Sequence, residues 1–310
     1  MVAAYLTAMA SPVNPTRPNP GRRVINLFAR LIPRRFRTDI PLVPVVRVSG
    51  VIGVVTPLRP GVVLSTIART LERAFNAPRA RAVALIVNSP GGSPAQSHLI
   101  YRRIRQLAEE KSLPVLTFVE DVGASGGYML ACAGDEIIAN EFSIVGSIGV
   151  VGASFGFHEL MEKVGIERRL YTAGDRKAML DPFLPEKPDD VKRIKEIQKD
   201  IHEHFIALVK ERRGSKLNGA DKRLFSGEFW TAQKAIELGL IDRIGDLRST
   251  LRERFGDKVH TPLFAAERSL FGRRLPGVGL VDARTGQPGG MADDLISALE
   301  VRALWGRYGL

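Results

Sequence analysis

The chain has 310 residues, of which 45% are hydrophobic, and this length is sufficient to bury a large core in one domain or two small ones. The five histidines and the single cysteine, Cys132, exclude a disulfide framework and show no zinc-ligand spacing, so we expect no metal and no cofactor. The formal net charge is +12, but large apolar residues separate the basic ones and no nucleic-acid-binding module is recognisable, so we expect no nucleic-acid partner.

The basic excess is concentrated at the N-terminus. Seven arginines and one acidic residue lie in the first 40 residues, so half of the net charge lies there. Within residues 22–37 (RRVINLFARLIPRRFR), apolar side chains recur at helical spacing and several arginines fall elsewhere on the helix. This pattern predicts an amphipathic helix that binds an anionic membrane surface; the alternative is a basic helix docked on the protein's own core.

The sequence contains no uncharged apolar run of the ~20 residues that are needed to span a bilayer. Residues 1–10 lack the positive segment and the long apolar segment of a cleaved signal peptide. We therefore expect a cytoplasmic protein without a transmembrane helix, held peripherally at the membrane by the basic segment.

Short β-branched runs alternate with longer amphipathic ones after Pro41. Strands are predicted at 43–49, 82–88 and 114–119, and helices at 61–76, 95–110 and 125–133. This alternation is typical of an α/β fold in which helices cover a parallel sheet.

The second half of the chain contains two further predicted helices. Residues 189–213 combine apolar periodicity with acidic residues at the start, basic residues at the end and Gly214 beyond, as expected for a helix of that length. A short amphipathic helix is predicted at 292–304. We expect three parts: a flexible basic arm (1–40), a catalytic domain (41–262) and a C-terminal extension with the short helix (263–310).

Two glycine-rich turns follow predicted strands. NSPGGS (88–93) can direct backbone amides at a developing negative charge, which makes it a candidate oxyanion hole. Gly123-Ala124-Ser125-Gly126-Gly127 matches the GxSxG pattern of a nucleophile elbow, with the serine at the start of a helix. Ser125 is therefore the candidate nucleophile.

A nucleophilic serine requires a base, and none of the five histidines lies in a distinctive setting. The better candidate is Lys177, within AGDRKAMLDPF (173–183), where charged residues are followed by apolar ones. A lysine acts as a general base only where its surroundings favour the neutral amine. The neighbouring Arg176 cannot share this role, since a guanidinium does not deprotonate near neutral pH.

Five motifs in order give the chain a family resemblance: NSPGGS (88–93), GASGGYMLACAGDEI (123–137), VGSIGVVG (145–152), AGDRKAMLDPF (173–183) and FWTAQKAIELGLIDRIG (229–245). Together they resemble the signal peptide peptidase A and SohB-type serine peptidases. The resemblance covers about residues 43–250. It implies a ClpP/crotonase-like fold of repeated ββα units with a parallel sheet, to which the C-terminal helical extension is added.

The resemblance also implies roles for individual residues. Ser125 is expected to be the nucleophile and Lys177 the general base, and the backbone amides of Gly92 and Gly126 are expected to form the oxyanion hole. Ser147 matches a family serine whose hydroxyl helps to orient the lysine. The implied activity is endopeptidase hydrolysis of apolar or membrane-derived peptides through an acyl-enzyme.

Family members with one catalytic domain per chain form rings in which the serine and the lysine come from adjacent subunits, so we expect a homo-oligomer. Many relatives carry a transmembrane anchor at the N-terminus, where this chain has the basic segment.

Other interpretations remain open at this point. An α/β-hydrolase-type esterase would pair Ser125 with a later histidine, and a crotonase-type acyl-CoA enzyme would share the fold without a nucleophilic serine. A ClpP-type triad would place a histidine about 25 residues after the nucleophile, where the chain has Val150. The chain could also be a catalytically inactive scaffold at a membrane surface.

Overall fold

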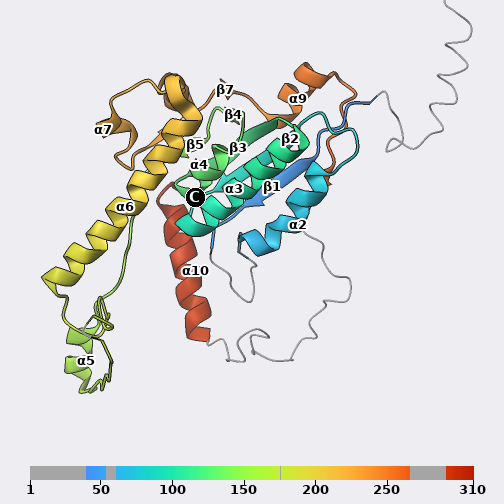
Figure 1. Ribbon diagram of the computed structural model, residues 1–310. Coiled ribbons are helices and arrows are strands. Elements are labelled where there is room, and N and C mark those ends of the chain that lie inside the picture. The colour runs from blue at the N-terminus through green and yellow to red at the C-terminus, as the bar shows by residue number, and fades with distance from the viewer. Residues whose placement is uncertain (1–39, 54–60, 175, 266–290) are drawn as a thin grey trace, which may run out of the picture. The chain divides into compact units, whose positions relative to one another are not determined.

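A computed structural model describes residues 40–53, 61–174, 176–265 and 291–310 (Figure 1). The chain divides into two compact units, residues 1–40 and 41–310, and apart from Ile40 the described residues belong to the second. The amphipathic helix expected at 22–37 lies outside the described residues, and the domain boundaries at 40 and 262 stay predictions. Among the helices described, none is both long and apolar enough to cross a membrane.

The described elements alternate between strands and helices through the first half of the chain, as the sequence pattern predicts. In chain order they are β1 (Val45–Ser49), α2 (Leu64–Phe75), β2 (Val83–Ser89), α3 (Pro94–Lys111), β3 (Val115–Ala124), α4 (Gly126–Ala131), β4 (Glu136–Ala139), β5 (Ile144–Gly146), α5 (His158–Val164), α6 (Pro188–Arg213), a 3₁₀ turn (Gly214–Lys216), α7 (Asp221–Leu224), β6 (Phe229–Thr231), α8 (Ala232–Glu237), β7 (Arg243–Ile244), α9 (Leu247–Phe255), β8 (Leu263–Phe264) and α10 (Met291–Gly306).

The described strands form one sheet. Its main path runs β6-β5-β3-β2-β1-β8, and β4 joins it by pairing with β3 and β7. The pairing of β5 with β6 is antiparallel and the other pairings of these strands are parallel. The predicted α/β class with a mainly parallel sheet is confirmed, and so is the C-terminal helix.

Alternating side chains along the central strands enter two different parts of the core. Val46, Leu85 and Val115 pack with α2, α3 and α4 on one face of the sheet, as Figure 1 shows for α2 and α3. Their neighbours Val45 and Leu116 pack on the other face with Leu251 of α9. Because both faces are covered, β2 is an almost continuous apolar run, which is typical of a central parallel strand.

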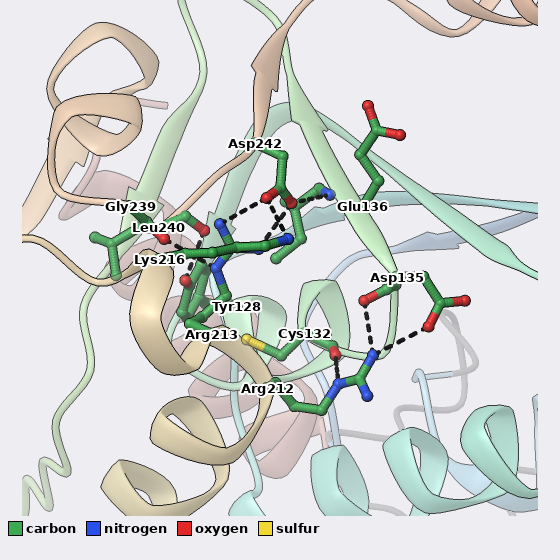
Figure 2. Close-up of polar contacts among 12 residues, drawn as sticks. Tyr128, Cys132, Asp135, Glu136, Arg212, Arg213, Lys216, Gly239, Leu240 and Asp242 are labelled. Carbon is green, nitrogen blue, oxygen red and sulfur yellow. Dashed lines mark hydrogen bonds and ion pairs between the residues drawn. The ribbon is translucent and has the colours of Figure 1, made fainter.

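A buried ionic network fixes the C-terminal end of α6 to the body of the domain (Figure 2). The Arg213 side chain is 3% exposed, and its guanidinium makes two hydrogen bonds, of 2.7 and 3.1 Å, to the carboxylate of Asp242. Its Nε also donates to the carbonyl oxygen of Gly239 at 2.9 Å. The adjacent Tyr128 of α4 donates its hydroxyl to the carbonyl oxygen of Leu240 at 2.7 Å. The network therefore joins α6 to the helix that begins directly after Ser125.

The Asp242 carboxylate satisfies several donors besides Arg213. It accepts the Ile137 amide at 2.8 Å and the Lys216 ammonium at 2.7 Å. Burial by itself would raise the pKa of Asp242, but the hydrogen bonds from Arg213, Lys216 and Ile137 outweigh it and hold the pKa below its usual value. The carboxylate is therefore ionised at neutral pH and balances the buried guanidinium.

We predict that Asp242→Asn lowers the free energy of unfolding by about 3 kcal/mol at neutral pH, because it leaves the charge of Arg213 buried and uncompensated. The folded-state pKa of Asp242 lies below the unfolded value of about 3.9, so the stabilisation is complete above that value and is lost as the pH falls through the folded-state pKa. Urea denaturation across this pH range measures the effect. The control is Asp257→Asn, at an exposed position. A difference between wild type and Asp242→Asn that persists undiminished into strong acid would contradict the assignment.

Candidate active site

Ser125 lies at the junction between β3 and α4. Its backbone angles are φ 53° and ψ −123°, a combination that a residue with a side chain adopts only under strain. The Ser125 amide donates to the carbonyl oxygen of Gly146 in β5 at 2.8 Å. Ser125 itself is half-buried, whereas Ala124 and Gly126 on either side are buried. The backbone therefore makes the sharp strand-to-helix turn that the GxSxG motif predicts.

The Gly91-Gly92 turn packs directly against this junction. A Cβ atom added to Gly91 would lie 2.8 Å from the amide nitrogen of Gly126 and 2.8 Å from Cβ of Ser125. A Cβ added to Gly92 would lie 2.0 Å from the carbonyl oxygen of Ile52. Both glycines also have positive φ, of 102° and 140°. Only glycine therefore allows this turn to approach the serine so closely.

The amides of Gly92 and Gly126 have no hydrogen-bond acceptor within the described part of the chain. Ile52 bridges the turn by donating to the Gly91 oxygen and accepting from the Ser93 amide, both at 2.8 Å, so the Gly92 amide is passed over. The Gly126 amide is the first of α4, and the first amides of a helix have no partner in the helix itself. Two donors on adjacent segments beside Ser125, both without an acceptor in the described ranges, are suited to hold an oxyanion.

The Asn88 side chain stabilises a β-bulge near the end of β3. The sequence alone did not predict this role for Asn88. Val87 pairs with Val119, but Ser89 pairs with Gly123, so β3 contains two more residues than β2 in this interval. The Asn88 side chain spans this bulge: its amide nitrogen donates to Asp121 at 2.6 Å and its oxygen accepts the Val122 amide at 3.2 Å. The bulge changes the direction of β3 just before Ser125. The feature of the sequence that could have indicated this bulge is an asparagine at the end of a predicted strand.

Ser147 lies one residue after Gly146, the residue that accepts the Ser125 amide. It is buried, it has a φ of 52°, and its own amide donates to the carbonyl oxygen of Glu228 at 2.6 Å. The structure therefore places Ser125, Gly126, Gly92 and Ser147 on neighbouring segments.

The end of the C-terminal helix α10 and the turn that follows it contribute to the surroundings of Ser125. Tyr308 is buried against Val122 and Ala124 of β3, with Trp305 packed beside it. The Tyr308 ring also meets the Phe229 ring of β6 edge-on, at a centroid distance of 5.0 Å. The sequence predicted this helix but not where it docks, because its amphipathic pattern does not specify a partner.

Lys177 is separate from this group of residues. It is exposed, on a turn between α5 and α6, and its amide donates to the carbonyl oxygen of Gly174 at 3.1 Å. The same turn contacts the start of α6 through a hydrogen bond from the Leu180 amide to Asp190. From Asp190 to Phe205, where α6 enters the core, the helix extends about 22 Å at its usual rise. No hydrogen bond joins Lys177 to Ser125 among the described residues.

The histidines and Cys132 among the described residues are further candidates for base or nucleophile. No hydrogen bond joins Ser125 to a histidine within the described residues; the His202 ring instead contacts the Ile148 carbonyl oxygen at 3.0 Å. Burial raises the pKa of the Cys132 thiol to about 12, so this thiol stays neutral and is a poor nucleophile.

Comparison with known proteins identifies the family. Residues 107–258 match the profile of peptidase family S49. The putative protease slr0021 of Synechocystis is 31% identical over 202 residues, which cover 63% of this chain and 72% of that protein. The chain belongs to peptidase family S49. The resemblance to the signal peptide peptidase A and SohB-type peptidases is thereby confirmed, and so is the expectation that the chain belongs to a family of serine peptidases.

Two further relatives extend the comparison of this S49 family member. A putative signal peptide peptidase SppA of Enterococcus faecium is 32% identical over 165 residues, covering 53% of this chain and 47% of that protein. A protein of Brucella abortus named Na⁺/H⁺ antiporter NhaA is 55% identical over 289 residues, covering 92% of this chain. This S49 chain matches only 39% of the length of that Brucella protein, so the larger part of the Brucella protein lies outside the match.

We predict that Gly92→Ala lowers kcat by about 10²- to 10³-fold, the usual effect of losing one oxyanion-hole donor. The new Cβ cannot coexist with the Ile52 carbonyl oxygen, so the turn and its amide must move. Peptide hydrolysis, with circular dichroism as the check on folding, measures this. Gly306→Ala is the control, since a Cβ there would meet nothing within 4 Å and φ is not positive. Activity of Gly92→Ala within about twofold of wild type would rule out this role for the turn.

Proposed function

We propose that the chain is a serine endopeptidase in which Ser125 is the nucleophile and Lys177 the general base. The observation that supports it best is the strained Ser125 backbone beside the amides of Gly92 and Gly126, which have no acceptor among the described residues. A strained serine next to free donors is the arrangement required for acyl transfer. We propose apolar or membrane-derived peptides as substrates, in line with the resemblance to signal peptide peptidases.

The proposed reaction has two stages. The neutral Lys177 amine takes the proton of the Ser125 hydroxyl as Oγ attacks the scissile carbonyl carbon, and the carbonyl oxygen becomes an oxyanion between the amides of Gly92 and Gly126. Collapse of this intermediate breaks the C–N bond, and the Lys177 ammonium gives its proton to the leaving amine. Lys177 then deprotonates a water molecule, which attacks the ester carbonyl carbon. The C–O bond to Ser125 breaks, the Lys177 ammonium returns its proton to Oγ, and the acid and free Ser125 are released. Ser147 is proposed to orient the lysine amine through its hydroxyl.

We also propose that the chain forms a homo-oligomer in which Lys177 reaches the Ser125 of a neighbouring copy. Among the described residues, no hydrogen bond joins Lys177 to Ser125 of the same chain. The segment around Lys177 also exposes many large apolar side chains, as expected of a surface that packs against another subunit. These are Val151, Phe155, Leu160, Val164, Ile166, Leu170 and Tyr171.

The antiport named for the Brucella relatives is not part of this proposal. The segment they share with this chain is the one that carries the peptidase motifs, including Ser125 and Lys177, and it covers 39% of their length.

We predict that Ser125→Ala and Lys177→Ala each lower peptide hydrolysis by about 10⁴-fold or more, because each removes one member of a cooperating pair. A pool of apolar peptides is the substrate, and size-exclusion chromatography checks assembly. Lys195→Ala, at an exposed position on α6, is the matched control and should retain full activity. If Ser125→Ala alone is inactive, an esterase-type site with another base is favoured. If wild type is also inert, the scaffold interpretation is favoured.

Mixing these two variants tests the shared site. An assembly that contains both inactive chains holds interfaces with one intact serine and one intact lysine, so activity should return on mixing and reassembly. A mixture that remains inactive although both chains are present in the same assemblies would contradict a site built from two subunits.

We further propose that residues 22–37 bind an anionic membrane surface and hold the peptidase peripherally at the cytoplasmic side. Six arginines within or at the ends of an apolar helical pattern support this proposal. Flotation with anionic liposomes should recover the full chain, should fail for a chain that lacks residues 1–38, and should weaken at high salt because the attraction is screened. Equal flotation of the shortened chain would contradict the proposal.

A further inference from the structure

The Asp181-Pro182-Phe183 segment closes the motif that contains Lys177, and the proposed dyad gives it no function. Lys177 lies on the turn that spans residues 176–180, and these three residues follow at once. Arg176 and Lys177 on this turn are exposed, residues 178–180 are half-buried, and Leu180 at its end has a positive φ of 56°. A lysine on such a turn requires support from neighbouring groups to occupy one position.

Asp181 forms the centre of a local cluster. Its side chain is only 8% exposed, and its carboxylate accepts the Arg168 guanidinium at 2.6 Å. The same carboxylate accepts the Phe183 amide at 3.0 Å. Arg168 is the only cation paired with this nearly buried carboxylate among the described residues, so removing Arg168 leaves Asp181 uncompensated.

Arg168 also lies against the aromatic side of the cluster. Its guanidinium carbon is 4.7 Å from the centroid of the Phe183 ring, a cation–π distance. The Phe183 ring packs on the Phe157 ring at 5.6 Å, and the Phe157 amide donates to the Pro182 carbonyl oxygen at 2.6 Å.

The cluster therefore ties together three stretches of chain that are separate in sequence. Phe157 belongs to the segment that runs from Ser147 towards α5, Arg168 follows α5, and Asp181 and Phe183 follow the lysine turn. The first of these segments begins beside the nucleophile and the last carries the lysine. Movement of the turn relative to α5 would break the Arg168–Asp181 ion pair and the ring contacts at the same time.

We propose that Arg168 and Asp181 are positioning residues for Lys177. By holding the end of the turn against Phe183 and Phe157, they fix where the amine of Lys177 is presented to the Ser125 that it serves. This inference rests on the proposed dyad. It adds two residues that touch neither substrate nor serine and act on the reaction only through the lysine.

The test uses mixed assemblies of a lysine donor, Ser125→Ala, and a serine donor, Lys177→Ala. With Arg168→Ala added to the lysine donor, we expect kcat to fall by about 10²-fold relative to the parental mixture while KM stays within about twofold, because a small misplacement of a catalytic group is enough for this loss. With Arg168→Ala added to the serine donor, whose own turn carries no lysine, we expect the activity of the parental mixture.

Arg169 provides the matched control. It adjoins Arg168 and forms an ion pair with Glu167. The side chains of Arg169 and Glu167 are both largely exposed, so Arg169→Ala should have no effect in either donor. Arg168→Lys keeps a charge for Asp181 and should recover part of the activity that Arg168→Ala loses. The same three variants can be made in the otherwise wild-type enzyme, in which every chain carries both Ser125 and Lys177. There we expect Arg168→Ala to lower kcat, Arg168→Lys to lower it less and Arg169→Ala to leave it unchanged, with KM unchanged in all three.

The outcomes separate the two proposals. Equal loss from Arg168→Ala in both donors would show a general structural effect and overturn the positioning role, as would unchanged kcat in the lysine donor. If the parental mixture is inactive, the variants of the otherwise wild-type enzyme test the positioning role instead. Full activity of Arg168→Ala in that enzyme overturns the inference. If Lys177→Ala alone retains activity, the dyad itself is wrong and the positioning role is lost with it.

Discussion

The strained backbone of Ser125 is the constraint on which the rest of the site depends. A residue with a side chain at positive φ costs on the order of 1–3 kcal/mol, and it persists only where its surroundings over-determine the conformation. Here the surroundings act on both sides of the residue. The Ser125 amide is bound by Gly146 of β5, and the Gly91-Gly92 turn packs against the next residue. The buried cores on the two faces of the sheet hold these strands in place, and they thereby maintain the strain that exposes the hydroxyl.

Much of the scaffold was predictable, because its signals are local. The strands expected at 43–49 and 82–88 are β1 and β2, and the helix expected at 189–213 is α6, which begins one residue earlier. Apolar periodicity and end residues specify such elements without reference to the rest of the chain. The glycine turns were also recognisable, since a positive φ or a close backbone approach leaves glycine as the only suitable residue.

The remaining features depend on contacts between distant segments, which periodicity does not encode. The strand expected at 114–119 continues to Ala124, because the Asn88 side chain holds a bulge that a simple alternating pattern does not show. Tyr308 packs beside Ala124 although about 180 residues separate the two in sequence. The position of Lys177 relative to Ser125 likewise follows from the length of α6 and not from any motif. The geometry around Ser125, Gly92 and Gly126 supports their proposed roles, and the roles of all five residues, with Lys177 and Ser147, stay proposals.

The separation of Lys177 from Ser125 also bears on when such an enzyme is active. In the proposed assembly, a newly made chain carries a serine without a base and a lysine without a serine, and it is latent until copies meet. Activity per chain then rises with the protein concentration, because two subunits must associate before a complete site exists. Dilution dissociates the assembly and inactivates the enzyme, so a protease of this kind has little activity while its concentration is low.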